Sequence, residues 1–177
     1  MKIIGISGSF RAASNNTGLL RAASGFAPDG IDILNYSEIP IYNGDDEAAS
    51  GAPARAIEIA ETIGQADGLM IACPEYNFSI PGGLKNLIDW LSRIRPMPFV
   101  GKPTAILGAA PGPIGTARVQ YDLRKVLSAL DADLVTKPEV FVGLSGSKFD
   151  GNGDLTDDTS REFVGKLVEA LVKKTAG

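Results

Sequence analysis

The sequence predicts a single α/β domain in which helices cover both faces of a parallel sheet. Short apolar segments alternate with amphipathic segments along the chain, which is the pattern of repeated strand–helix units. Two apolar segments, residues 68–73 and 103–110, are nearly continuous, as in central strands buried on both faces. The 177 residues are 44% hydrophobic and can form one core, so we expect residues 1–177 to be one domain.

The first half of the chain contains three of the five predicted strands. Residues 2–6 and 31–34 are the first two, with a helical segment between them, and residues 68–73 are the third. Residues 43–52 are polar and predict an exposed loop. Pro53 suits the first position of the next helix. The apolar face predicted for that helix consists of Ile57, Ala60 and Ile63.

The next helix lies between the third strand and the fourth, residues 103–110. A stripe with helical spacing predicts its core face: Leu84, Leu87, Ile88 and Leu91. Trp90 and Ile94 flank this stripe and could serve a subunit contact.

The last part of the chain predicts two more helices and a broken strand. The first helix covers residues 115–131, and the fifth strand comprises Val135 and residues 139–142, interrupted by Pro138. The apolar face of the first helix contains Val119, Leu123, Val126, Leu127 and Leu130. Thr159 or Ser160 is expected to cap the final helix. The residues of that helix expected to face inward are Phe163, Leu167, Val168 and Leu171.

The polar loop over residues 148–158 resembles the start of a calcium-binding loop. Asp150, Asn152 and Asp154 have the alternating spacing of such a loop, but the glycine is out of place and no Glu stands at the twelfth position. We therefore predict no metal site.

The composition excludes several classes of function. The sequence has no histidine and a single cysteine, which excludes His-based triads, His- or Cys-cluster metal sites and an internal disulfide. A net charge of −4 argues against a nucleic-acid surface. No apolar run reaches the roughly 20 residues of a membrane span, and the N-terminus does not resemble a signal peptide. We expect a cytoplasmic protein.

The loop between the first strand and the first helix has the composition of a phosphate cradle. Small residues let the backbone approach an anion, and the free N–H groups and dipole of the helix start attract it. Hydroxyls of Ser7, Ser9 and Ser14 can donate hydrogen bonds, and Arg11 adds positive charge. The alternative is a polar turn that only caps the helix, but this needs a single Ser or Asn.

The absence of two known phosphate-binding motifs limits which phosphate ligands the loop could bind. Gly5 and Gly8 do not form G-x-G-x-x-G, Asn35 stands where the acidic residue of that motif is expected, and no P-loop occurs. Hydroxyls with one arginine suit a terminal phosphate monoester such as that of FMN.

The loop after the third strand is expected to form a second wall of the same site. In a sheet of order 2-1-3-4-5 the ligand binds at the carboxyl ends of the strands, between the first and the third. Pro74 and Pro81 stiffen this loop, so backbone amides between them can bind the polar edge of a flat heterocycle. Gly82 and Gly83 allow close approach of a ligand or partner.

Together the two loops resemble the NADPH-dependent FMN reductase family, which has a flavodoxin-like three-layer fold and includes quinone, chromate and azo-dye reductases. The resemblance is carried by G-S-F-R-A-A-S-N-N-T from Gly8 to Thr17 and by P-E-Y-N-F-S-I-P-G-G-L-K-N from Pro74 to Asn86. It continues through R-V-Q-Y-D-L-R from Arg118 and K-P-E from Lys137, and so covers most of the chain.

The resemblance implies bound FMN, with NADPH or NADH as hydride donor. The residues that it implies for the phosphate are Ser9, Arg11, Ser14, Asn16 and Thr17. Those for the isoalloxazine ring, mainly through the backbone, are Pro74, Glu75, Tyr76 and Asn77, with Ser79 close by. The loop over Ala109–Gly112, with Ala110 and Gly112, would close the far side; Ala109 and Ala110 replace the Ser or Thr common there.

The implied activity is that of an FMN-dependent NAD(P)H oxidoreductase that reduces quinones, azo compounds, chromate or similar small-molecule acceptors by a ping-pong mechanism. Two alternatives remain open: a flavodoxin-type electron carrier, and a reductase that releases free reduced FMN. Arg11 and the P-E-Y-N loop favour the enzyme, because the first loop of the carriers usually lacks an arginine. Since hydride transfer between nicotinamide and flavin needs no protein acid or base, we assign no catalytic side chain.

The sequence allows two interpretations of several residues. Cys73 is expected to be a small core residue rather than a redox thiol. Glu75 is either a proton donor or a backbone ligand, and Tyr76 either stacks on the ring or covers the rim. The family is commonly a homodimer or homotetramer, and Arg118, Tyr121 and Glu139 are either polar contacts across that interface or ordinary surface residues.

Overall fold

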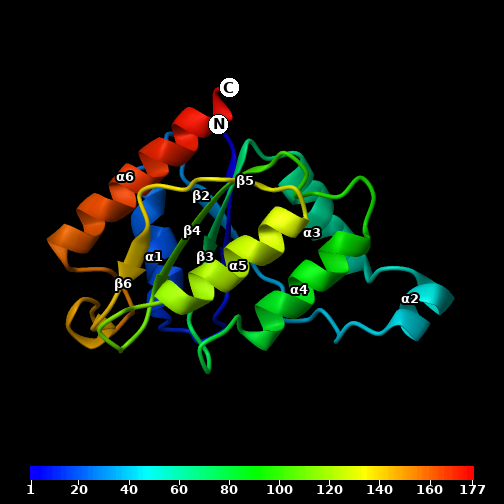
Figure 1. Ribbon diagram of the computed structural model, residues 1–177, viewed down its shortest axis with the longest axis horizontal. Coiled ribbons are helices and arrows are strands. Elements are labelled where there is room, and N and C mark those ends of the chain that lie inside the picture. The colour runs from blue at the N-terminus through cyan, green and yellow to red at the C-terminus, as the bar shows by residue number, and fades with distance from the viewer.

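The computed structural model describes all residues 1–177 and shows a parallel sheet between two layers of helices (Figure 1). The strand order is β2-β1-β3-β4-β5, with β6 also paired to β4, and every pairing is parallel. The strands are β1 (Ile3–Ser7), β2 (Ile31–Leu34), β3 (Gly68–Ala72), β4 (Pro103–Ala109), β5 (Asp133–Leu134) and β6 (Val140–Val142). The predicted order 2-1-3-4-5 is therefore confirmed.

Each face of the sheet carries its own hydrophobic cluster. On one face pack α1 (Asn15–Ser24) and α6 (Asp158–Thr175), whose buried leucines Leu19, Leu20 and Leu167 contact the sheet. The other face is covered by α3 (Ala54–Gly64), α4 (Gly82–Arg93) and α5 (Ala117–Ala129). The stripe predicted for α4 is buried as expected: Leu84, Leu87, Ile88 and Leu91.

The predicted fifth strand exists as two short strands, both against β4. Thr104 pairs with Leu134 in β5, and Leu107 pairs with Val140 in β6. The chain leaves the sheet between them in the segment that contains Pro138, a residue that cannot donate a ladder hydrogen bond. This is the interruption that the proline predicts.

The predicted loop over residues 43–52 contains a short helix, α2 (Gly44–Ser50), which corrects that prediction. Asn43 caps it by accepting a hydrogen bond from the N–H of Asp45, and acidic residues occupy its first turn. None of its residues is buried, so it has no apolar stripe that a periodicity could reveal.

The inward faces of two helices are rotated from the predicted ones. Ile57 is 39% exposed, and α3 instead buries Ala56, Ile59, Ala60 and Ile63. Phe163 is also exposed, and the N-cap of α6 is Asp157, whose Oδ2 accepts hydrogen bonds from the N–H and hydroxyl of Ser160 at 2.8 and 2.6 Å. On α5, Val119, Leu123 and Leu127 are buried, whereas Val126 and Leu130 are only half-buried.

Trp90 lies inside the protomer and not at a subunit surface. It is 1% exposed, its ring meets that of Tyr42 edge to face at 4.9 Å, and its indole N–H donates to the carbonyl of Pro40 at 2.8 Å. These two contacts hold the segment that contains Pro40 and Tyr42, just before α2, against α4. None of the helices combines the length and apolar character needed to cross a membrane.

We expect Trp90→Phe to lower the free energy of unfolding by about 1 kcal/mol, because it removes the hydrogen bond between the buried indole and the carbonyl of Pro40, which is left with Asn86 as its donor. Urea unfolding followed by circular dichroism measures this. Phe163→Leu, at an exposed aromatic side chain, should change stability by less than about 0.5 kcal/mol. Equal stability of wild type and Trp90→Phe would show that the hydrogen bond from Trp90 to Pro40 does not stabilise the fold.

Candidate functional site

The carboxyl ends of β1, β3 and β4 meet at one edge of the sheet, and the loop after each strand lies there. The N–H of Gly8 donates to the carbonyl of Ala72 at 2.8 Å, and that of Cys73 donates to Leu107 at 2.9 Å. The β1 and β3 loops also touch, since a β-carbon on Gly8 would lie 2.8 Å from Cδ of Pro74. The two loops that the sequence assigns to one site are therefore neighbours.

Phe10 extends the contact between these two loops. A β-carbon on Gly83, at the start of α4, would lie 2.8 Å from the Phe10 ring. The Phe10 ring also meets Tyr36 edge to face at 4.8 Å. Gly83 was expected to admit a ligand or partner closely, and the group that approaches it in the protomer is Phe10.

The β1 loop, residues 8–14, is built as an anion cradle. Ser14 is the N-cap of α1 and accepts a hydrogen bond from the N–H of Thr17, whose hydroxyl donates to Ser7 Oγ at 2.8 Å. The N–H groups of Phe10 and of residues 12–16 have no acceptor within the chain. A run of free N–H groups that ends at a helix start is the arrangement that binds phosphate in proteins.

Asn16 joins the start of α1 to the end of β4. Its side-chain amide donates to the carbonyl of Ala109 and accepts from the N–H of the same residue, both at 3.0 Å. Asn16 is 5% exposed, so this pair of bonds is buried. The side chain is thus occupied by the protein, and its backbone N–H is the group left for an anion.

The β3 loop ends in a tight hairpin turn. Tyr76 and Ser79 exchange two backbone hydrogen bonds of 3.1 and 3.0 Å, and the residues between them, Asn77 and Phe78, have φ values of 49° and 67°. Positive φ at both central positions is the geometry of a type I′ turn, which asparagine favours and phenylalanine does not. The site is therefore held in a conformation that costs backbone strain.

Arg118, at the start of α5, supports this turn. Its guanidinium lies 2.7 Å from a Glu75 oxygen and 3.9 Å from the centre of the Phe78 ring, and the other Glu75 oxygen accepts the N–H of Val119 at 3.2 Å. Both carboxylate oxygens of Glu75 are thus engaged, which favours a structural role over that of a proton donor. The sequence does not predict the ion pair between Arg118 and Glu75, because the two residues are 43 positions apart and leave no local pattern.

Two cavities adjoin these loops. One, of about 310 Å³, is lined by Ser7, Ser9, Arg11 and Thr17 together with residues 33–37. The other, of about 550 Å³, lies between the β3 and β4 loops and is lined by Glu75, Asn77, Ala110 and Gly112 with apolar Phe78 and Ile114. Among the other residues predicted for the site, Ser14, Asn16, Pro74, Tyr76 and Ser79 line neither cavity, although all belong to these loops or to the first turn of α1.

The titratable groups under the site are neutral and inert. Burial, reinforced by the Glu75 carboxylate, raises the pKa of Cys73 to about 12, and the thiol is fully buried. Burial also raises the pKa of Tyr36, whose hydroxyl donates to the carbonyl of Ser7 at 2.8 Å. Neither residue is an acid–base group near neutral pH, and Cys73 is a core residue as expected.

The three polar residues that could lie at a subunit interface, Arg118, Tyr121 and Glu139, all bind partners within the protomer. Arg118 binds Glu75, as described above. Hydrogen bonds from Lys137 and from Tyr121 hold the pKa of Glu139 below its usual value.

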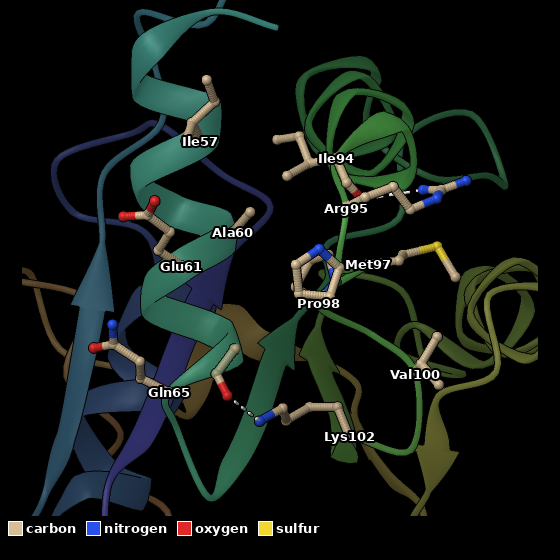
Figure 2. Close-up of a pocket in the computed structure, with 12 residues that line it drawn as sticks. Ile57, Ala60, Glu61, Gln65, Ile94, Arg95, Met97, Pro98, Val100 and Lys102 are labelled. Atoms are coloured by element: carbon tan, nitrogen blue, oxygen red, sulfur yellow. Dashed lines mark hydrogen bonds between the residues drawn. The ribbon is translucent and has the colours of Figure 1, made fainter.

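A third cavity lies away from these loops, between α3 and the segment after α4 (Figure 2). It measures about 440 Å³ and lies beside Lys102, next to the amino end of β4. Its basic side chains already have partners: Lys102 donates to the carbonyls of Gly64 and Ala66, and Arg95 to those of Ser92 and Ile94. The polar side chains of its lining that have no such partner are Glu61 and Gln65, so the cavity offers no free positive charge to an anionic ligand.

Comparison with known proteins places this chain in a family. The family model described as NADPH-dependent FMN reductase matches residues 1–146. The chain is 46% identical to an NAD(P)H-dependent FMN reductase of Pseudomonas aeruginosa, over 97% of this chain and 93% of that protein. It is 42% identical to a quinone reductase of Escherichia coli, over 94% and 92% of the two chains.

Solved structures agree with this assignment. FerB from Paracoccus denitrificans, a flavoenzyme NAD(P)H:(acceptor) oxidoreductase, superposes with a TM-score of 0.87 and 29% identity, covering 99% of this chain and 98% of FerB. The motifs, the strand order and these relatives lead to one conclusion. The chain belongs to the NADPH-dependent FMN reductase family.

Proposed function

We propose that FMN binds across the β1 and β3 loops and that the chain is an NAD(P)H oxidoreductase acting on quinones and similar small acceptors. The observation that carries this proposal is that one sheet edge holds both the anion cradle of residues 8–16, which Asn16 bonds to Ala109, and a cavity of about 550 Å³ lined by the following residue, Ala110. A molecule with a phosphate tail and a flat ring can use both. The names of the relatives support the cofactor and the quinone.

The phosphate would be held by the residues of the cradle. Free N–H groups and the hydroxyls of Ser9 and Ser14 would supply hydrogen bonds, and the exposed Arg11 would supply charge. The hydroxyl of Thr17 donates to Ser7 Oγ, so Thr17 would support the cradle through Ser7. The backbone N–H of Asn16 belongs to the first turn of α1, where the helix dipole favours an anion. The residues present therefore fit a phosphate monoester.

The ring would lie between the β3 and β4 loops. Pro74, Glu75, Tyr76, Asn77 and Ser79 contribute mainly backbone groups, and the N–H groups of Glu75 and Asn77 have no acceptor within the chain. On the other side Ala110 and Gly112 offer backbone only, because this chain lacks a hydroxyl there. FMN bound there would supply the redox chemistry for electron transfer between NAD(P)H and the acceptor.

The protein's own part is to bind and orient. Phe78, Pro111 and Ile114 give the ring cavity an apolar rim, which suits flat acceptors such as quinones and azo compounds. Donor and acceptor would use this one cavity in turn, which gives ping-pong kinetics. We assign no catalytic side chain, because Glu75 is tied to Arg118 and Cys73 is a buried thiol.

We also propose a cytoplasmic homodimer or homotetramer that binds neither nucleic acid nor membrane. Ile41, Val100 and Tyr121 are large exposed side chains that a second copy could cover. The use of NAD(P)H suits the cytoplasm.

The purified protein should be yellow, and anaerobic NADPH or NADH should bleach the flavin absorbance within seconds. Steady-state rates with a quinone as acceptor should give parallel lines in double-reciprocal plots. A bound flavin that NAD(P)H does not bleach would instead indicate a one-electron carrier. Intersecting lines would exclude the ping-pong mechanism, and loss of the flavin at each turnover would identify FMN as a substrate.

Arg11→Gln should raise the dissociation constant of FMN by about tenfold, the effect of losing one charged hydrogen bond. Riboflavin, which lacks the phosphate, should bind the variant and the wild type equally. Arg93→Gln is the matched control, since Arg93 pairs with Glu47 on α2. Equal weakening of FMN and riboflavin binding would remove Arg11 from the phosphate site.

Cys73 gives a pH prediction. The folded protein keeps the thiol proton up to a pKa of about 12, whereas the unfolded chain loses it near 9.0. The stability from this difference is fully present below pH 9 and is lost as the pH rises toward 12. In urea unfolding, Cys73→Ala should lose less stability than wild type over this range and keep its turnover at neutral pH. Loss of turnover in this variant would show that the thiol takes part in the reaction.

A further inference from the structure

The turn over residues 149–155 contains the acidic residues that resemble a calcium loop, and hydrogen bonds within the turn hold it closed. Oδ1 of Asp150 accepts the N–H groups of Asn152 and Asp154, both at 2.9 Å. Two backbone bonds of 3.0 Å join Asp150 to Asp154 and Gly153 to Asp150. The turn is therefore closed by its own bonds.

This turn touches the phosphate cradle backbone to backbone. Gly153 is buried, with a φ of 78°, and a β-carbon on it would lie 3.0 Å from the carbonyl carbon of Ala13 and 3.2 Å from that of Ser14. On Gly18, in α1, a β-carbon would lie 1.7 Å from the Gly153 carbonyl oxygen. Only glycine at both positions allows this approach.

Two further contacts fix the turn relative to α1. Arg21 Nε lies 2.6 Å from Oδ1 of Asp154, and Arg21 Nη2 donates to the carbonyl of Asn152 at 3.2 Å. Leu155, which is 4% exposed, belongs to the same hydrophobic cluster as Leu19 and Leu20. The turn is thus anchored in the core on one side and against the cradle on the other.

We propose that the 149–155 turn positions the phosphate cradle and thereby sets the affinity of the chain for the phosphate group of FMN. The proposal rests on the proposed function. Ala13 and Ser14 belong to the run of N–H groups without an acceptor, and the atoms packed against their carbonyl groups are those of Gly153. A cradle held in place before binding loses less conformational entropy when the anion arrives. Gly153, Asp154 and Arg21 are positioning residues.

Two variants and two matched controls test this. Gly153→Ala pushes the turn away from Ala13, and Asp154→Asn breaks the ion pair with Arg21. The control Gly151→Ala adds a methyl group to the same turn with no heavy atom within 4 Å. The control Glu162→Gln breaks an exposed ion pair with Lys166 on α6. The full-length apoproteins are titrated with FMN and with riboflavin, and binding is followed by flavin fluorescence.

We expect the dissociation constant of FMN to rise about tenfold in Gly153→Ala, since alanine is strained at a φ of 78° and its β-carbon would crowd Ala13, so the turn must shift. In Asp154→Asn it should rise about threefold, because an exposed ion pair contributes little. Riboflavin binding should not change in either variant, and neither control should affect FMN. This selectivity separates positioning of the phosphate from a general loss of stability.

Equal weakening of FMN and riboflavin, or no change in either, would overturn the proposal while leaving the proposed function intact. If Gly153→Ala does not fold, Asp154→Asn and Arg21→Gln decide. Asp154→Asn removes only the exposed ion pair, and Arg21→Gln removes that pair together with the hydrogen bond to the carbonyl of Asn152. A wild-type protein that binds FMN no better than riboflavin would instead show that residues 8–16 hold no phosphate. That result would overturn the proposed function as well.

Discussion

The site depends on how the backbone N–H and carbonyl groups at the end of β4 find hydrogen-bond partners. The N–H and carbonyl of Ala109 are buried at the end of this central strand, where leaving them unpaired would cost roughly 1–3 kcal/mol each. The side-chain amide of Asn16 binds both groups and so locks the first turn of α1 against the sheet. Asn16 is also the last residue in the run of free N–H groups. The two hydrogen bonds that pair the end of β4 therefore also fix the position of the anion cradle.

Most of the fold could be predicted because it depends on local patterns. The buried runs of β3 and β4, the strand interrupted at Pro138 and the stripe of α4 are all visible in neighbouring residues. The predictions that failed concern features that no pattern of large apolar residues reveals. The core face of α3 begins at Ala56, whose small side chain hid the true register and left Ile57 as the more conspicuous residue. Helix α2 depends on its cap and acidic first turn alone, and Trp90 is buried by a distant segment.

The same distinction holds at the site. The loops could be found because a strand followed by small residues, hydroxyls and an arginine is a local signal, and their meeting follows from the strand order. The supports of these loops come from far along the chain. Arg118 reaches Glu75, and Gly153 reaches Ala13, through contacts that no spacing rule contains. The positive φ of Phe78 is likewise set by its surroundings, since phenylalanine does not favour it.

The broken strand at one side of the sheet has a consequence for solubility. An open parallel sheet presents two edges, which other chains can extend by strand addition. Here β5 and β6 are only 2 and 3 residues long, Pro138 lies between them, and Lys137 and Glu139 place charges beside the break. At the opposite edge β2 has 4 residues and carries the exposed Asp32. Both borders of the sheet are thus poor templates for edge-to-edge aggregation.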